Sequence, residues 1–126
     1  MKHVVFSKGT ELLRVPLDRL MYISSDGNYS NVVTQDGRKR LIGIQLGQIE
    51  DILEAQFGNS ISNIIRLGRS LIINTDYIYF IDTTKQLLIM SDCAGSLHEL
   101  TASRESLITL KAYFDELINN QNDSKD

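Results

Sequence analysis

The sequence predicts a mainly-β domain: an elongated sandwich of small, mostly antiparallel sheets with one short internal helix and a C-terminal helix. Three observations support this. The apolar segments are short, turn residues recur about every ten residues, and together they delimit about ten strands. Only two segments carry apolar residues at helical spacing. The length of 126 residues suits one domain that buries its own core.

Turn residues delimit the predicted strands. Pro16 ends one strand because proline cannot donate to a ladder, and Asp36-Gly37 is a strong hairpin signal. Gly68-Arg69-Ser70 interrupts a long apolar run and makes it a strand pair or one bent strand. In chain order, we expect strands at residues 4–6, 11–15, 20–23, 29–34, 38–44, 64–73 (interrupted as described), 77–81, 87–90 and 97–100.

At residues 45–57 the apolar residues follow helical spacing and not the two-residue alternation of a strand, which predicts a helix. Gly58-Asn59 ends this predicted helix. The final helix begins after Ser103, a favourable N-cap, with Glu105 in its first turn. Apolar residues line one side of it as far as Leu117. We therefore expect one domain at residues 1–118 and a disordered polar tail at 119–126.

The sequence lacks the usual signs of an enzyme. His3 and His98 belong to no ligand-spaced cluster, and no phosphate-cradling glycine loop is present. We expect no catalytic activity, no cofactor and no metal site. Cys93 is the single cysteine, and no apolar run is long enough to span a membrane, so we expect a cytoplasmic protein.

The net charge of −3 does not by itself exclude nucleic acid as a partner. Residues 1–104 carry 11 cations and 11 acids, so the acidic excess lies at the C-terminus. DNA responds to local basic surface, and cations here cluster near turns. They are Arg38, Lys39 and Arg40 after one turn, and Arg66 and Arg69 around another. Arginine on such a turn can bind guanine or phosphate, or it can simply keep an edge strand soluble.

Residues 66–78, RLGRSLIINTDYI, resemble the signature of LytTR-type DNA-binding domains. Three further blocks agree in order and spacing: residues 17–23 with the following Asp26-Gly27-Asn28-Tyr29, Asp36-Gly37 with residues 46–53, and residues 100–104. The resemblance covers roughly residues 12–117. It implies a bacterial transcriptional regulator, of the kind found as a response regulator effector domain, whose loops enter successive major grooves of double-stranded DNA.

The resemblance also implies how the domain is used. Family members commonly bind direct repeats about one helical turn apart, so we expect two copies on each DNA site. The family's domain usually follows a receiver or a membrane segment. Here the first predicted strand starts within a few residues of Met1, so we expect a free-standing regulator or an excised domain.

The resemblance implies three DNA-contacting loops, which are placed in this sequence by their position in the matching blocks. They hold Asn28, Tyr29 and Ser30; Gly68, Arg69 and Ser70; and Ser103, Arg104 and Glu105. We expect Arg69 to be the principal base reader, with Tyr29, Arg104 and Asn28 beside it. We expect Asn74 to bond to backbone. It belongs to a second set of residues that contact phosphate or support the loops: Arg66, Lys39, Arg40, Ser30, Ser70, Asn74 and Ser103.

Two positions depart from the family pattern. Many members carry a histidine where Leu67 or Gly68 stands, and a second basic residue where Glu105 stands. A carboxylate is repelled by phosphate, yet it can accept from cytosine N4 and it suits the start of a helix, the role we favour. Glu105 and the acidic tail also motivate the alternative, a protein-interaction module that keeps the fold without DNA binding.

Overall fold

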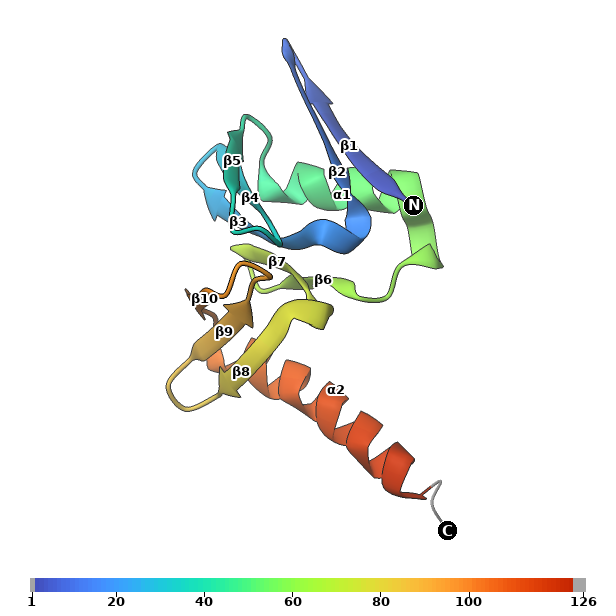
Figure 1. Ribbon diagram of the computed structural model, residues 1–126, viewed down its shortest axis with the longest axis vertical. Coiled ribbons are helices and arrows are strands. Elements are labelled where there is room, and N and C mark those ends of the chain that lie inside the picture. Colours follow the sequence, from blue (N-terminus) through green and yellow to red (C-terminus); the bar gives the residue numbers. More distant parts are fainter. Residues whose placement is uncertain (1, 124–126) are drawn as a thin grey trace.

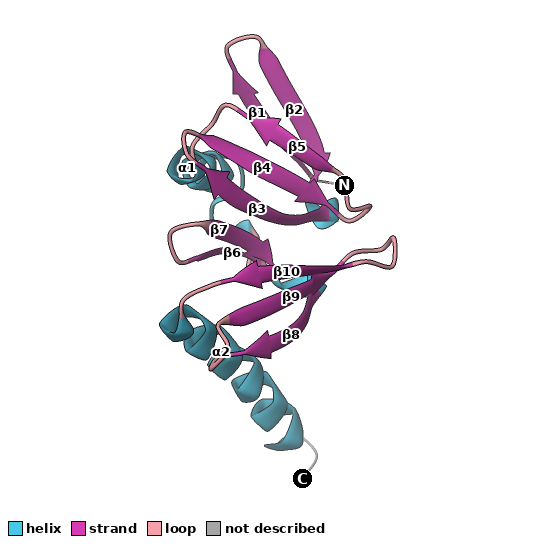
Figure 2. Ribbon diagram, turned by 90° about the vertical axis from the view of Figure 1, so that its left-hand side faces the viewer, coloured by secondary structure: helices cyan, strands magenta, loops and turns pink. Residues whose placement is uncertain are grey.

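The computed structural model describes residues 2–123, and within them the mainly-β prediction is confirmed. Three antiparallel sheets and two α-helices stack along one long axis (Figure 1, Figure 2). The strands are β1 (His3–Lys8), β2 (Glu11–Pro16), β3 (Leu20–Asp26), β4 (Tyr29–Thr34), β5 (Lys39–Ile42), β6 (Ile64–Leu67), β7 (Leu71–Asn74), β8 (Ile78–Asp82), β9 (Leu87–Ser91) and β10 (Leu97–Thr101). The helices are α1 (Leu46–Phe57) and α2 (Arg104–Asp123).

A five-stranded sheet of order β5-β4-β3-β7-β6 forms the middle layer and separates two hydrophobic cores. The first core lies between this sheet, the β1–β2 hairpin and α1. The second lies between the sheet, the three-stranded sheet β10-β9-β8 and α2. Because both faces are covered, the central strands are almost continuously apolar. This explains the uninterrupted runs at residues 20–23 and 71–73.

A bulge in β3 allows this one short strand to contribute side chains to both cores. The register against β4 shifts between Leu20 and Tyr22, so Met21 and Tyr22 both join the second core. Leu20 and Ile23 join the first core. Strict alternation would have placed Met21 and Tyr22 on opposite faces of the sheet.

The predicted start of α2 is confirmed, but its predicted end is wrong. Ser103 caps the helix, since its Oγ accepts from the Ser106 backbone N–H at 3.2 Å. The helix continues to Asp123, through residues 119–123 that the sequence assigned to the irregular tail. Its last turns lose their apolar periodicity yet contain no glycine or proline to break the helix. Residues 124–126 of the predicted tail lie outside the described residues.

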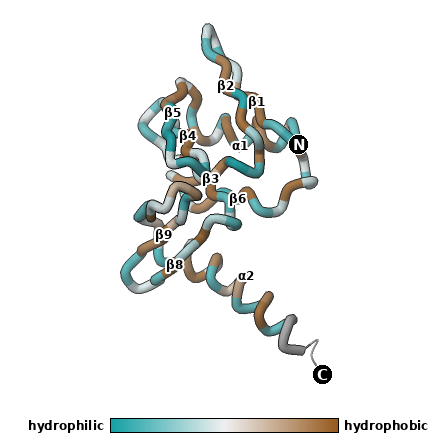
Figure 3. The backbone as a smooth tube through the Cα atoms, in the orientation of Figure 1, coloured by the Kyte–Doolittle hydropathy of each residue, from teal (hydrophilic) through white to brown (hydrophobic). Residues whose placement is uncertain are grey.

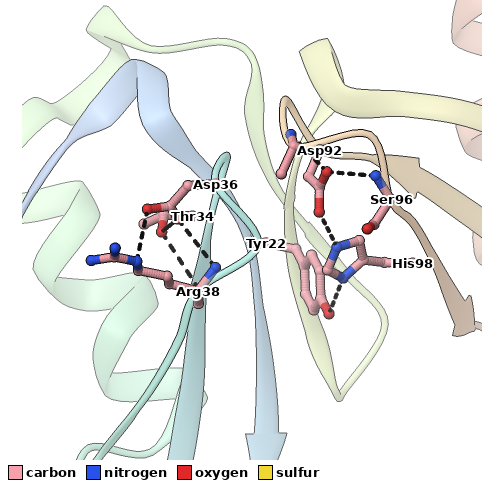
Figure 4. A network of polar contacts seen from close by, with 8 residues as sticks. Tyr22, Thr34, Asp36, Arg38, Asp92, Ser96 and His98 are labelled. Carbon is pink, nitrogen blue, oxygen red and sulfur yellow. Dashed lines mark hydrogen bonds and ion pairs between the residues drawn. The ribbon is translucent and has the colours of Figure 1, made fainter.

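A polar network joins the middle sheet to the three-stranded sheet (Figure 4). His98 Nε2 lies 2.7 Å from Asp92 Oδ2, and His98 Nδ1 lies 3.3 Å from the Tyr22 hydroxyl. The hydrogen bond with His98, then those from the Ser96 and Ala94 amides, hold the pKa of Asp92 below its usual value against desolvation. The network fixes the β9–β10 turn against the middle sheet.

Candidate nucleic-acid interface

Three loops lie next to one another along one side of the molecule. β3 and β7 run antiparallel, so the β3–β4 and β6–β7 turns lie side by side, and the Ser25 N–H donates to the Ser70 carbonyl at 2.9 Å. A Cβ placed on Gly68 would lie 3.6 Å from Ser106 Oγ, which brings the start of α2 beside the β6–β7 turn. Figure 2 shows the three loops one below the other along the left side of the molecule. They are loop one (residues 26–29), loop two (68–70) and loop three (103–105).

Loop one is a two-residue hairpin turn. Asp26 pairs with Tyr29 across it, and Gly27 adopts a φ of +62° that favours glycine. The Tyr29 side chain is exposed. The Asn28 Oδ1 accepts from the Gln45 Nε2 at 2.9 Å, which ties the turn to the start of α1. The turn therefore presents an aromatic ring and an amide on an anchored backbone.

Loop two is a three-residue turn that Arg66 holds from behind. Leu67 pairs with Leu71 across it, and Gly68 has a φ of +66°. Arg66 donates from Nε to the Gly68 carbonyl at 2.9 Å and from Nη2 to the Arg69 carbonyl at 3.1 Å. The Arg66 guanidinium is thus engaged by two carbonyls of its own turn. Arg69 is exposed, and within residues 2–123 its side chain forms no hydrogen bond or ion pair.

Loop three is the first turn of α2. Ser103 Oγ also donates to Ser106 Oγ at 2.8 Å, so two hydrogen bonds join the capping residue to Ser106. Arg104 and Glu105 follow, and both are exposed. A carboxylate at this position interacts favourably with the helix dipole. The exposed carboxylates of Asp26 and Glu105 lie among the exposed arginines, so the three loops do not form a uniformly basic surface.

Several predicted site residues lie elsewhere or are buried. Ser30 and Asn74 are both 0% exposed. Ser30 Oγ donates to the Ile44 carbonyl at 2.7 Å, and Asn74 Nδ2 donates to the Leu20 carbonyl at 2.9 Å, so both support the backbone. Asn74 lies at the end of β7 away from loop two.

The two predicted phosphate contacts on β5 do not lie at the loops. Lys39 pairs with Val33, at the end of β4 opposite Tyr29. Arg40 is one residue nearer to loop one and lines a groove under the β1–β2 hairpin. The structure therefore gathers Asn28, Tyr29, Arg69 and Arg104 at one side, with Ser70 and Ser103 as their neighbours, and separates Lys39 from them.

One cation near the loops was missed from the sequence. Lys8, at the end of β1, lines a cleft together with Asn28 and Tyr29 of loop one. The Lys8-Gly9 turn was visible in the sequence, but nothing there indicated that the β1–β2 hairpin lies beside loop one. Lys8 lies outside the segments that carry the family resemblance.

Comparison with known proteins gives two matches. A sequence profile of the family described as LytTr DNA-binding domain matches residues 10–115. Among solved structures, a similar chain is the LytTr DNA-binding domain of a Bacillus cereus protein described as a methyl-accepting/DNA response regulator. The two share 20% sequence identity over 94% of this chain and 97% of that one, with a TM-score of 0.56. The search of curated proteins found no match. Across residues 2–123, neither helix combines the length and hydrophobicity that crossing a membrane requires.

Proposed function

The chain belongs to the LytTr DNA-binding domain family, and from that premise we propose that it regulates transcription by reading double-stranded DNA with its three adjacent loops. Each loop enters the major groove from one side of the duplex. The observation that carries this proposal is the placement of two exposed arginines, Arg69 and Arg104, on neighbouring loops that are anchored to the same sheet.

Arg69 is the principal base reader. Its guanidinium offers two parallel N–H donors, which match the O6 and N7 acceptors of guanine in the major groove. Arg66 holds the Arg69 backbone by a hydrogen bond to the Arg69 carbonyl at 3.1 Å. A fixed backbone lowers the entropy lost when Arg69 binds, because only its side chain has to be ordered.

Three other side chains contact bases next to the position read by Arg69. Arg104 can donate to guanine, and the Asn28 Nδ2 can donate to an acceptor on the base edge. The exposed Tyr29 ring can contact the thymine methyl group. Ser70, Ser103 and Arg66 stabilise the loops. Each good bidentate pair supplies about 1–3 kcal/mol of discrimination against the wrong base.

Two copies of the domain bind each regulatory site, on direct repeats about one helical turn apart. A repeat spaced by about 10–10.5 base pairs presents both half-sites on the same face of the duplex. A single row of loops on each domain suits this arrangement, since each copy approaches from that face. Changing the spacing between the two repeats by half a helical turn would place the second copy on the opposite face of the duplex. The simultaneous binding of two copies would then be weaker.

The experiment begins with the selection of bound fragments from genomic DNA at physiological salt. The dissociation constant is then measured on the selected duplex and on a random duplex. Arg69→Ala should lose about tenfold or more on the selected duplex, which is about 1.4 kcal/mol, and much less on the random one. Arg38→Ala is the matched control, because the Arg38 side chain is 89% exposed and lies on the β4–β5 turn away from the loops. Equal losses on both duplexes would contradict a base-reading role for Arg69.

A protein-interaction module is the second candidate, favoured by the exposed carboxylates of Asp26 and Glu105 within the loops. Carboxylates repel phosphate, whereas they suit a basic protein partner. Such a module would show no salt-dependent retardation of any genomic fragment in a gel shift. Retardation that weakens steeply with salt would favour DNA binding.

A further inference from the structure

We propose that the cleft between the tip of the β1–β2 hairpin and loop one binds a phosphate of the DNA backbone, with Lys8 as its cation. This inference rests on the proposed DNA binding and extends the interface beyond the three loops. The cleft measures about 430 Å³ and is lined by Lys8, Asn28, Tyr29, Gly43, Gln45 and Gln48. No carboxylate is among its lining residues, although the Glu11 carboxylate lies beside Gly43 at its edge.

The hydrogen bonds around the cleft occupy side-chain amide oxygens and leave several N–H and O–H donors without partners. The Gln45 backbone N–H donates to Gln48 Oε1 at 3.2 Å, as part of a capping box at the start of α1. Gln45 Nε2 in turn donates to Asn28 Oδ1 at 2.9 Å. In the same capping box the Gln48 backbone N–H donates to the Gln45 side chain. Because a backbone N–H can only donate, both glutamine amides accept through their oxygens, which leaves Gln45 Nε2 as the donor to Asn28 Oδ1.

The remaining groups are those that an anion needs. Gln48 Nε2 and the Tyr29 hydroxyl have no hydrogen-bond partner among the described residues, and neither does the Lys8 ammonium. Phosphate offers only acceptor oxygens and a negative charge. The cleft therefore matches it in both hydrogen bonding and charge.

The cleft continues the interface already described. It shares Asn28 and Tyr29 with loop one, so a duplex held at that loop passes beside Lys8. The hairpin tip is hydrophilic to neutral in hydropathy (top of Figure 3). Lys8 pairs in register with Glu11 across the hairpin, and the Glu11 carboxylate lies at the edge of the cleft, 3.7 Å from a Cβ placed on Gly43. Among the described residues the Lys8 ammonium forms no ion pair with it, so its charge is available to a phosphate.

The test measures dissociation constants on the selected and random duplexes over a series of salt concentrations. The association constant K falls as salt rises, and Lys8→Gln should make the slope of log K against log salt less steep by about 0.9 on both duplexes. The same variant should weaken binding about fivefold at 0.15 M salt. Gln48→Glu keeps the oxygen that caps α1 but places a carboxylate in the cleft, so it should weaken binding further. Lys2→Gln, at the other end of β1, makes the same charge change and should leave the slope unaltered.

A duplex with one neutral methylphosphonate identifies the source of the phosphate. At the contacted position, the wild-type protein and Lys8→Gln should bind this duplex equally, because the partner of Lys8 is gone. Circular dichroism and thermal unfolding check that each variant is folded.

The outcomes separate this inference from the proposed function. If the wild-type protein binds no duplex, both fail. If Arg69→Ala loses the preference for the selected duplex while Lys8→Gln and Lys2→Gln have the same slope, only the phosphate cleft is overturned. If inorganic phosphate shifts the Asn28 and Gln48 side-chain resonances while Lys8→Gln binds DNA normally, the cleft binds free anions and the inference is again overturned.

Discussion

Replacing Arg66 by lysine separates loop support from phosphate contact. Lysine keeps the positive charge, so a residue whose role is to attract phosphate tolerates the change. Lysine lacks the planar fork that reaches two carbonyls at once. If Arg66 shapes loop two, Arg66→Lys should therefore resemble Arg66→Gln in both stability and DNA binding.

The expected loss follows from the contacts of Arg66. Its bonds to the Gly68 and Arg69 carbonyls, at 2.9 and 3.1 Å, involve a charged donor whose side chain is 28% exposed. Each such bond contributes about 1 kcal/mol net when it is partly solvated. The pair with Glu50 at 3.4 Å adds about 0.5 kcal/mol at most, because the Glu50 side chain is 52% exposed. We expect Arg66→Lys to lower the free energy of unfolding by about 2 kcal/mol.

The DNA-binding consequence is selective. A loosened loop two must be ordered on binding, so affinity for the selected duplex should fall about tenfold, while affinity for random DNA changes little. Urea unfolding gives the stability, and fluorescence anisotropy gives the dissociation constants. Arg38→Lys is the control, with an expected change under about 0.5 kcal/mol because Arg38 is almost fully exposed. Wild-type stability and binding in Arg66→Lys would refute the loop-support argument.

Three further predictions concern the scaffold. Gly37→Ala would place a Cβ 2.9 Å from Asp92 Oδ2 at a φ of +82°, so it should lose more stability to urea than Gly95→Ala, whose φ is +92° but whose Cβ would meet nothing within 4 Å; equal losses would mean that backbone strain alone matters. Asn74→Ala should cost about 2–4 kcal/mol, measured by urea unfolding, because it leaves buried backbone groups without partners; a loss below 1 kcal/mol would contradict this. The pKa of Asp92 is depressed when folded, so its contribution to stability is present above its ordinary value of 3.8 and is lost as pH falls through the lower folded value. Asp92→Asn should therefore flatten the fall in stability measured by thermal unfolding below pH 4, and an unchanged profile would assign the acid sensitivity to other groups.

Much of the fold could be predicted because local signals determine it. Asp36-Gly37 and Gly27-Asn28 specify tight turns through the backbone conformations they favour, and Ser103 marks the start of α2 by its capping chemistry. The position of Lys39 also follows from simple geometry. It comes after the turn at the end of β4 opposite Tyr29, so it lies away from loop one.

The rest depended on contacts between distant segments. Tyr22 and His98 are 76 residues apart, and no local pattern indicates that they share a hydrogen-bonding network. The role of Arg66 depends on carbonyls of its own turn, which carry no sequence signal. Lys8 was missed because the packing of the β1–β2 hairpin beside loop one depends on the first core. The end of α2 was misplaced because its polar final turns have no apolar stripe.

Chemical-shift mapping of the labelled protein on addition of the selected duplex tests the account most directly. Backbone amide and arginine side-chain resonances should shift most at residues 26–29, 68–70 and 103–105, with the largest change at the Arg69 Nε–H. Shifts centred on the β4–β5 turn, the β9–β10 turn or the second half of α2, with the three loops unperturbed, would contradict reading of DNA by this side of the molecule.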